Sequence, residues 1–152
     1  MLRFRPATSA DIDVITDFNC RLAEETEHRS LDRDTVRNGA RRGLEIGDEV
    51  RYFLAEDDSG VIGQLMLTRE WSDWRDGWMI WLQSVYVAAG KRGAGVFRKL
   101  LTFAIAEVSA DTDAVNIRLY VDHTNEAAKA SYRRIGFHSA GFEVMEMPLE
   151  RK

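Results

Sequence analysis

The stretch SVYVAAGKRGAGVFRKLL, residues Ser84–Leu101, decides the fold prediction. It passes from an apolar, strand-like segment through a turn with three glycines and a Lys-Arg pair into an amphipathic helix. Glycine lets a ligand approach the backbone closely, and the start of a helix presents N–H groups that bind anions. The stretch therefore predicts a phosphate-bearing ligand, with a tight strand-to-helix turn that binds nothing as the alternative.

The composition is that of an ordinary globular protein. The 152 residues predict one domain, residues 1–152, and no apolar run approaches the roughly 20 residues that span a bilayer. The net charge of −4 argues against general nucleic-acid binding. The single cysteine, Cys20, excludes an internal disulfide, and the N-terminus lacks the apolar core of a signal peptide, so we expect a cytoplasmic protein.

Periodicity and turn signals predict an α/β fold. It is expected to have a mixed, mostly antiparallel sheet of six to seven strands flanked by about four helices. The expected strands are 2–5, 51–56, 61–74, 78–87, 115–121 and 142–149, and the expected helices are 12–27, 32–46, 97–108 and 125–135. Asp76-Gly77 is typical of a two-residue type I′ hairpin, which would place Glu70 opposite Gln83.

Two familiar phosphate-binding motifs do not match the glycine segment. A P-loop requires G-x-x-x-x-G-K-[ST], which the chain lacks, and the dinucleotide motif G-x-G-x-x-G lacks its third glycine after Gly93-Ala94-Gly95. A turn that wraps a pyrophosphate at the start of a helix fits better, with Arg92 and either Lys91 or Arg98 adding positive charge.

A second segment, LYVDHTNEAAKASYRRIGF at Leu119–Phe137, carries a further pattern. With the glycine segment it resembles the GNAT superfamily of acyl-CoA-dependent N-acetyltransferases. The first segment is similar to that family's [QR]-x-x-G-x-[GA] loop, with Arg92 and Gly95 in register. The second is similar to its N-x-x-A-x-x-x-Y-x-x-x-G-F helix, with Asn125, Ala128 and Tyr132 in register. The resemblance covers the whole chain, because the order of the elements also matches.

The resemblance implies transfer of an acetyl group from acetyl-CoA, as cosubstrate, to a primary amine of a small molecule or peptide within one ternary complex. Homodimers are common in the family. The scattered positions of His28, His123 and His138 and the lack of cysteine pairs argue separately against a metal site. The residues implied to hold the CoA pyrophosphate are Arg92, Gly93, Ala94, Gly95, Val96, Phe97 and Arg98. The family often has Gly or Ala where this chain has Phe97. Since Phe97 shares a helical stripe with Leu100, we expect its ring to point into the core.

The resemblance also assigns catalytic roles. Backbone N–H groups of Val85, Tyr86 and Val87 would stabilise the oxyanion where the central strand splays from its neighbour. Asn125 and Ala128 would contact the CoA arm, although Asn125 would equally serve as a helix N-cap. Tyr132 would protonate the departing thiolate, the alternative being an ordinary aromatic on a buried helix face.

The general base is left open between carboxylates. Glu70, on the acetyl side of the predicted hairpin, is one candidate, and Glu25 and Glu27 at the end of the first helix are others. Each could equally be a solvated surface charge. Trp71 and Trp74 are candidates for an acceptor-pocket wall, although tryptophans at strand spacing are usually sheet core. The alternative function is a catalytically inactive GNAT-like module that binds acyl-CoA as a sensor.

Overall fold

The computed structural model describes residues 1–111 and 113–151. The strands are β1 (Arg3–Pro6), β2 (Val50–Asp57), β3 (Gly60–Ser72), β4 (Gly77–Val87) and β5 (Ala114–Leu119). The α-helices are α1 (Ile12–Glu27), α2 (Arg33–Ile46), α3 (Val96–Asp111) and α4 (Glu126–Ile135), with 3₁₀ turns η1 (Ser9–Asp11) and η2 (Ala89–Lys91). The chain forms two compact units, Met1–Tyr120 and Val121–Lys152. No helix in the described part of the chain is long and apolar enough to cross a membrane.

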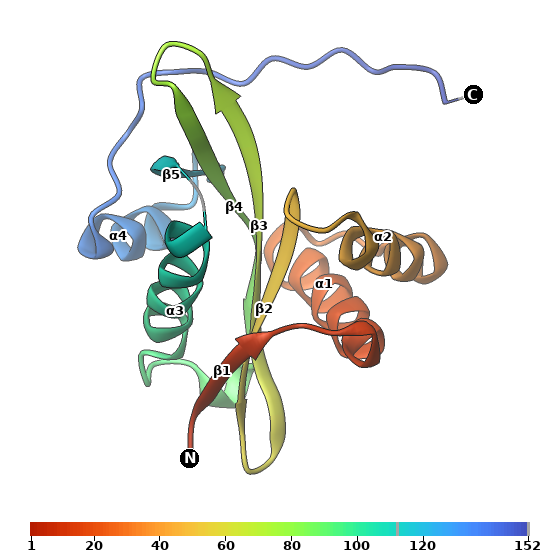
Figure 1. The fold of residues 1–152 in the computed structure, drawn as a ribbon. Helices are drawn as coiled ribbons and strands as arrows, with labels where there is room; N and C mark the ends of the chain where they lie inside the picture. The colour runs from red at the N-terminus through yellow and green to blue at the C-terminus, as the bar shows by residue number, and fades with distance from the viewer. Residues whose placement is uncertain (112, 152) are drawn as a thin grey trace. The chain divides into compact units, whose positions relative to one another are not determined.

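The first unit contains one mixed sheet in the order β1-β2-β3-β4-β5 (Figure 1). Its first three pairings are antiparallel, and β4 pairs with β5 in parallel. The expectation of six to seven strands was wrong, because the described residues form five. The segment 142–149 is in no strand, and its Phe142 and Leu149 are exposed. Alternating polarity predicts a strand, but a strand also requires a partner, which alternation does not identify.

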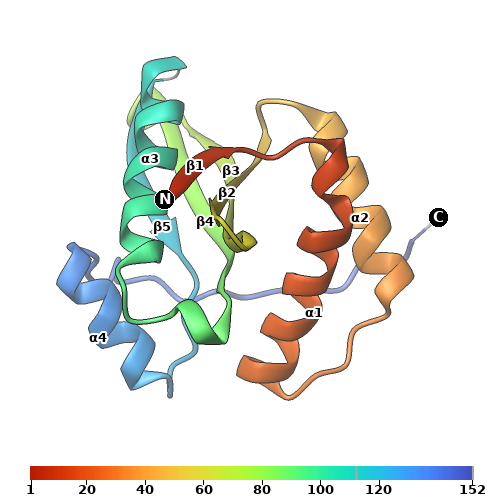
Figure 2. The ribbon, with the colours of Figure 1, turned by 90° about the horizontal axis from the view of Figure 1, so that it is seen from below.

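Helices cover both faces of this sheet, with α1 and α2 on one side and α3 on the other (Figure 2). Successive side chains of β2 point to opposite faces of the sheet, so the strand packs against the helices on both sides. Phe53 meets Phe103 of α3 edge to face at 6.1 Å, whereas Tyr52 and Leu54 join a buried cluster with Ile15 of α1. Burial on both faces explains why the strands read as nearly continuous apolar runs.

The β3–β4 hairpin differs from the sequence prediction. Its loop has four residues, Asp73–Asp76, and the closing rung pairs Ser72 with Gly77. Asp76 has a φ of 47°, but Gly77 does not adopt a positive φ, so the type I′ turn is absent. A Cβ at Gly77 would lie 2.4 Å from Val115 Cγ1. Close packing against β5, and not turn conformation, is therefore what requires glycine there.

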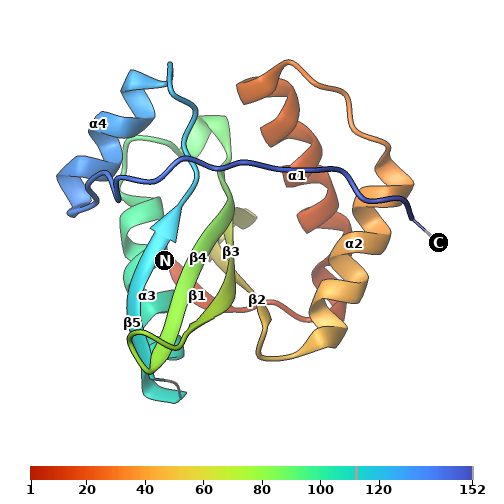
Figure 3. The same ribbon diagram turned by 90° about the horizontal axis from the view of Figure 1, so that it is seen from above.

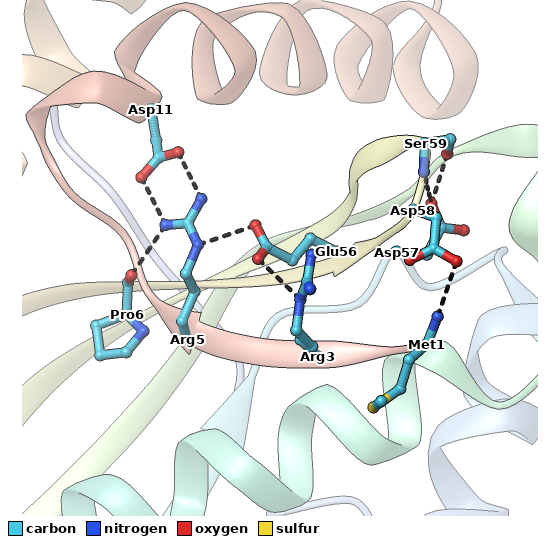
Figure 4. A network of polar contacts seen from close by, with 9 residues as sticks. All are labelled: Met1, Arg3, Arg5, Pro6, Asp11, Glu56, Asp57, Asp58 and Ser59. Carbon is cyan, nitrogen blue, oxygen red and sulfur yellow. Dashed lines mark hydrogen bonds and ion pairs between the residues drawn. The ribbon is translucent and has the colours of Figure 1, made fainter.

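An ion-pair network ties the first strand to its neighbours (Figure 4). Arg5 donates two hydrogen bonds of 2.9 Å to the two oxygens of Asp11 and one of 3.0 Å to Glu56. Asp11 is 6% exposed and also accepts a 2.7 Å bond from the Thr8 backbone. This bidentate pair fixes β1 against the start of α1, because it constrains both position and orientation.

Candidate functional site

The glycine segment forms an open loop between β4 and α3. Gly93 and Gly95 have φ values of 85° and 75°, which side chains other than glycine rarely adopt. Beyond the chain neighbours, no heavy atom among the described residues lies within 4 Å of where a Cβ at either glycine would be. The loop backbone is therefore accessible from outside.

The helix that follows presents its N-terminus at this loop. Its first intrahelical bond beyond the loop runs from the Lys99 N–H to the Gly95 carbonyl at 3.1 Å. The N–H groups of the preceding turn have no i−4 carbonyl to pair with, so they offer donors and partial positive charge to an anion. Val96 is buried, but Phe97 is only half-buried. At the start of α3, Val96 is therefore the residue that packs in the core, and Phe97 lies at the margin of the core.

The two basic side chains of the loop are held by carboxylates. Lys91 lies 2.6 Å from Asp57 at the end of β2, and its hydrogen bond holds the pKa of that carboxyl well below its usual range. Arg92 donates to Glu25 of α1 at 2.8 Å and to the Val87 carbonyl at 2.8 Å. Both side chains therefore anchor the loop to neighbouring elements.

Glu25 extends this contact into the end of β4. Its other carboxylate oxygen accepts a hydrogen bond from the Tyr86 hydroxyl at 3.3 Å, and the Arg92 guanidinium lies 5.3 Å from the centre of the Tyr86 ring. Phe18, about two turns earlier in α1, packs on the same ring at 4.9 Å. The last turn of α1 is thus fixed against both β4 and the glycine loop.

Strand β4 separates from β5 just before this loop. The two strands lie side by side over Trp78–Leu82 (Figure 3), and their last paired rung in the described part of the chain joins Leu82 to Leu119. Val85, Tyr86 and Val87 follow that rung. The sequence-predicted oxyanion donors therefore belong to the part of β4 beyond its pairing with β5.

Of the proposed bases, Glu70 is displaced from its expected register. It pairs with Met79, whereas Gln83 pairs with Met66, because the hairpin loop is centred two residues earlier in the chain than the predicted Asp76-Gly77 turn. Its Oε1 accepts a 2.8 Å bond from the Trp81 indole N–H. The observed partner of Glu70 thus lies four residues farther from Val85 along β4 than the two-residue turn implied.

Glu27 ends α1 as an exposed carboxylate with Arg29 at 3.8 Å. It lies two residues after Glu25, which contacts Arg92 and Tyr86 as described above. Among the described residues, Glu25 is therefore the carboxylate candidate that contacts both the glycine loop and the end of β4, whereas Glu70 contacts β4 at Trp81.

Two tryptophans, Trp78 and Trp81, are half-buried on the sheet, and two are exposed near the hairpin end. Trp71 packs edge to face on Trp78 at 5.0 Å and is 48% exposed, and Trp74 at the hairpin tip is 93% exposed. Trp81 is half-buried and stacks on Tyr120 at 4.6 Å. The hairpin end therefore carries an exposed aromatic surface.

The second unit holds the remaining predicted residues. Asn125 is the N-cap of α4, and its side chain accepts a 3.0 Å bond from the Ala128 backbone. Tyr132 contacts Phe137 edge to face at 5.7 Å, and burial raises the pKa of its phenol above the ordinary value of 10.0. A phenol in this state keeps its proton throughout the neutral range.

Sequence reasoning missed one buried polar residue, Gln64 of β3, which is 0% exposed. Its Nε2 donates to Asn19 Oδ1 and to the Ser84 carbonyl, each at 3.0 Å. A signal was available, because Gln64 is the one polar side chain in the apolar run VIGQLML at residues 61–67.

Comparisons with known proteins agree with this arrangement. The model of the acetyltransferase (GNAT) family matches residues 13–137. The crystal structure of a possible acetyltransferase from Clostridium difficile 630 is 34% identical, with 99% of each chain covered and a TM-score of 0.91.

Two more distant structures share the fold. A probable acetyltransferase is 24% identical over 99% of each chain, with a TM-score of 0.82. A predicted acetyltransferase from Clostridium acetobutylicum, solved with acetyl-CoA, is 16% identical with a TM-score of 0.79, and the match covers 97% of this chain and 96% of that one. Since the family model spans well over half of the sequence, this chain belongs to the GNAT acetyltransferase family.

Proposed function

We propose that this protein is a cytoplasmic N-acetyltransferase that moves an acetyl group from acetyl-CoA to a primary amine of a small molecule or peptide. The amine attacks directly in a ternary complex, and residues 1–152 act as one catalytic domain. The observation that carries the proposal is the end of β4, which leaves β5 after Leu82 and leads into an open glycine loop at the N-terminus of α3.

In this proposal the loop binds the diphosphate of the cofactor. Main-chain N–H groups between Arg92 and Arg98 donate to the phosphate oxygens, and the α3 N-terminus adds favourable potential. Arg92 acts mainly through the backbone, since its guanidinium is engaged with Glu25 and Val87. Asn125 and Ala128 are assigned to the pantetheine arm, as the family motif implies.

The chemistry needs a neutral amine and a stabilised oxyanion. Deprotonating a lysine-like amine at pH 7 costs about 4–5 kcal/mol, from a pKa near 10.4 and about 1.4 kcal/mol per pH unit. A carboxylate among Glu25, Glu27 and Glu70 accepts that proton, directly or through water. The N–H groups of Val85–Val87 stabilise the tetrahedral oxyanion.

Tyr132 completes the reaction as general acid. The amine nitrogen bonds to the acyl carbon, the C–S bond breaks, and the phenol proton goes to the thiolate. The proton that the nitrogen loses on becoming an amide restores the phenol through solvent. The Tyr132 phenol carries the proton at neutral pH, as this role requires.

The test is acetyl transfer to a panel of amines, followed by the release of free CoA thiol. We expect release that depends on both acetyl-CoA and an amine, and a Tyr132→Phe variant with kcat lowered about tenfold or more and CoA affinity within about twofold of the wild type. The absence of both thiol release and CoA binding would refute the proposal. CoA binding without transfer to any amine would instead favour the sensor function.

A further inference from the structure

Strand β4 contains a β-bulge at the point where it leaves its neighbour. Gln64 pairs with Tyr86 and Met66 pairs with Gln83, so Ser84 and Val85 together lie opposite Leu65. Two residues against one is the definition of a bulge, and it bends the strand that carries the extra residue.

The bulge follows directly on the end of β4–β5 pairing. Up to Leu82 the strand is paired on both sides, with Leu67 of β3 and Leu119 of β5. Ser84 comes two residues later. The bulge therefore sets the direction of the backbone in the segment to which the proposed function assigns the oxyanion donors.

Ser84 adopts an unfavourable backbone conformation at this bulge. Its φ is 51°, in the left-handed region, which costs a non-glycine residue about 1–2 kcal/mol. Such a conformation persists only where surrounding contacts hold it, and such sites cluster where function requires them.

Gln64 supplies the contact that holds it. The Gln64 side chain is 0% exposed, and its Nε2 donates to the Ser84 carbonyl and to Asn19 Oδ1 of α1, each at 3.0 Å. Its Oε1 is buried without a hydrogen-bond partner among the described residues. A buried amide with an unpaired acceptor is a costly core residue, so its two donated bonds are its main contribution.

Peptide geometry carries this contact to the proposed oxyanion site. The Ser84 C=O and the Val85 N–H belong to one planar trans peptide group and point in opposite directions. When Gln64 fixes the carbonyl, it also fixes the N–H, directing it away from Gln64.

Resting on the proposed function, we infer that Gln64, braced by Asn19, is a positioning residue that aims the Val85 N–H at the thioester oxygen. It touches neither substrate nor cofactor. It acts by holding the bulge in the one orientation in which the Val85 amide donates to the developing oxyanion.

The test replaces Gln64 by methionine, which has a similar volume but no donor. We expect Gln64→Met to lower kcat about tenfold or more, since a misplaced oxyanion donor costs about 10²-fold. The Kd for CoA should stay within about twofold. The matched control is Thr16→Val, because Thr16 is also 0% exposed but its hydroxyl bonds only Ile12 of its own helix among the described residues. It should leave kcat unchanged.

Asn19 provides a second pair of variants if Gln64→Met folds poorly. Asn19→Asp keeps the acceptor for Gln64, so its kcat should stay within about threefold of the wild-type value. Asn19→Leu removes the acceptor and should lower kcat by more than about threefold. Wild-type kcat in Gln64→Met or in Asn19→Leu would overturn the inference.

A readout on the free protein separates this inference from the proposed function. The ¹⁵N–¹H resonance of Val85 should be single in the wild type and exchange-broadened on the μs–ms timescale in Gln64→Met. If the wild type neither binds CoA nor acetylates amines, the proposed function falls, but this signal still reports on the bulge. An unchanged Val85 resonance in Gln64→Met would refute the role of Gln64.

Discussion

Glu25 shows how single residues define the site. Its two carboxylate oxygens accept from the Tyr86 hydroxyl and the Arg92 guanidinium, and Arg92 also donates to the Val87 carbonyl. One carboxylate thus connects α1, β4 and the glycine loop. The sequence named both Glu25 and Arg92, but their pairing across 67 positions could not be read from it.

Asp11 gives a residue-scale prediction about stability. The hydrogen bonds from Arg5 lower the pKa of the Asp11 carboxyl, so its stabilising effect is present above the unfolded pKa near 3.9 and is lost as the pH falls through the folded value. Asp11→Asn should lower the free energy of unfolding by about 3 kcal/mol at pH 7, because it leaves Arg5 with half of a bidentate pair. Urea unfolding at neutral pH and at about pH 3 measures both effects.

The gap between Asp11→Asn and wild type should narrow as the pH drops below about 4. The control is Asp58→Asn, since Asp58 is exposed and pairs only the terminal amine of Met1 among the described residues. It should change stability by under about 0.5 kcal/mol. A gap that stays constant down to acid pH would show that the ionised form of Asp11 is not what stabilises β1.

At the scale of elements, the contact between the hairpin and β5 depends on one glycine. A Cβ at Gly77 would lie 2.4 Å from Val115 Cγ1 and 2.7 Å from the Asp113 carbonyl oxygen, whose bond to the Trp78 N–H starts the β4–β5 contact. We expect Gly77→Ala to lower the free energy of unfolding by about 1–3 kcal/mol, because the backbone must shift to relieve the overlap.

Gly39 is the matched control for that substitution. It lies exposed in α2, with no heavy atom among the described residues within 4 Å of where its Cβ would be, excluding its own helix backbone and neighbours. Gly39→Ala should raise the free energy of unfolding by about 0.5–1 kcal/mol, because alanine favours the helix. Equal effects of the two alanines in chemical denaturation would contradict the packing of Gly77 against β5.

At the scale of the whole molecule, the sequence predicted most of the fold and part of the site. Helical spacing and caps located α2 between Asp32 and Gly47, as observed. The hairpin register was wrong because a four-residue loop replaces the type I′ turn, and that moved Glu70 away from Gln83. Segment 142–149 failed as a strand because alternation alone does not supply a partner strand.

The site could be predicted only where chemistry is local in sequence. The glycine loop and the Asn125 cap are formed by residues close together in the sequence, so sequence motifs could predict both. The Gln64 side chain bonds the Ser84 carbonyl on the neighbouring strand at a bulge, and hydrophobic periodicity does not predict bulges. Long-range polar contacts of this kind require coordinates.

The central claim, that the loop amides bind the diphosphate of CoA, is tested most directly by calorimetric titration of CoA into wild type, Gly95→Val and Gly90→Ala. A valine at Gly95 must adopt a φ of 75° and covers the loop backbone, whereas no heavy atom among the described residues, chain neighbours aside, lies within 4 Å of a Cβ at Gly90. We predict that Gly95→Val weakens CoA binding about tenfold or more and that Gly90→Ala binds within about twofold of wild type. Equal affinity of Gly95→Val and wild type, with both folded, would contradict the claim.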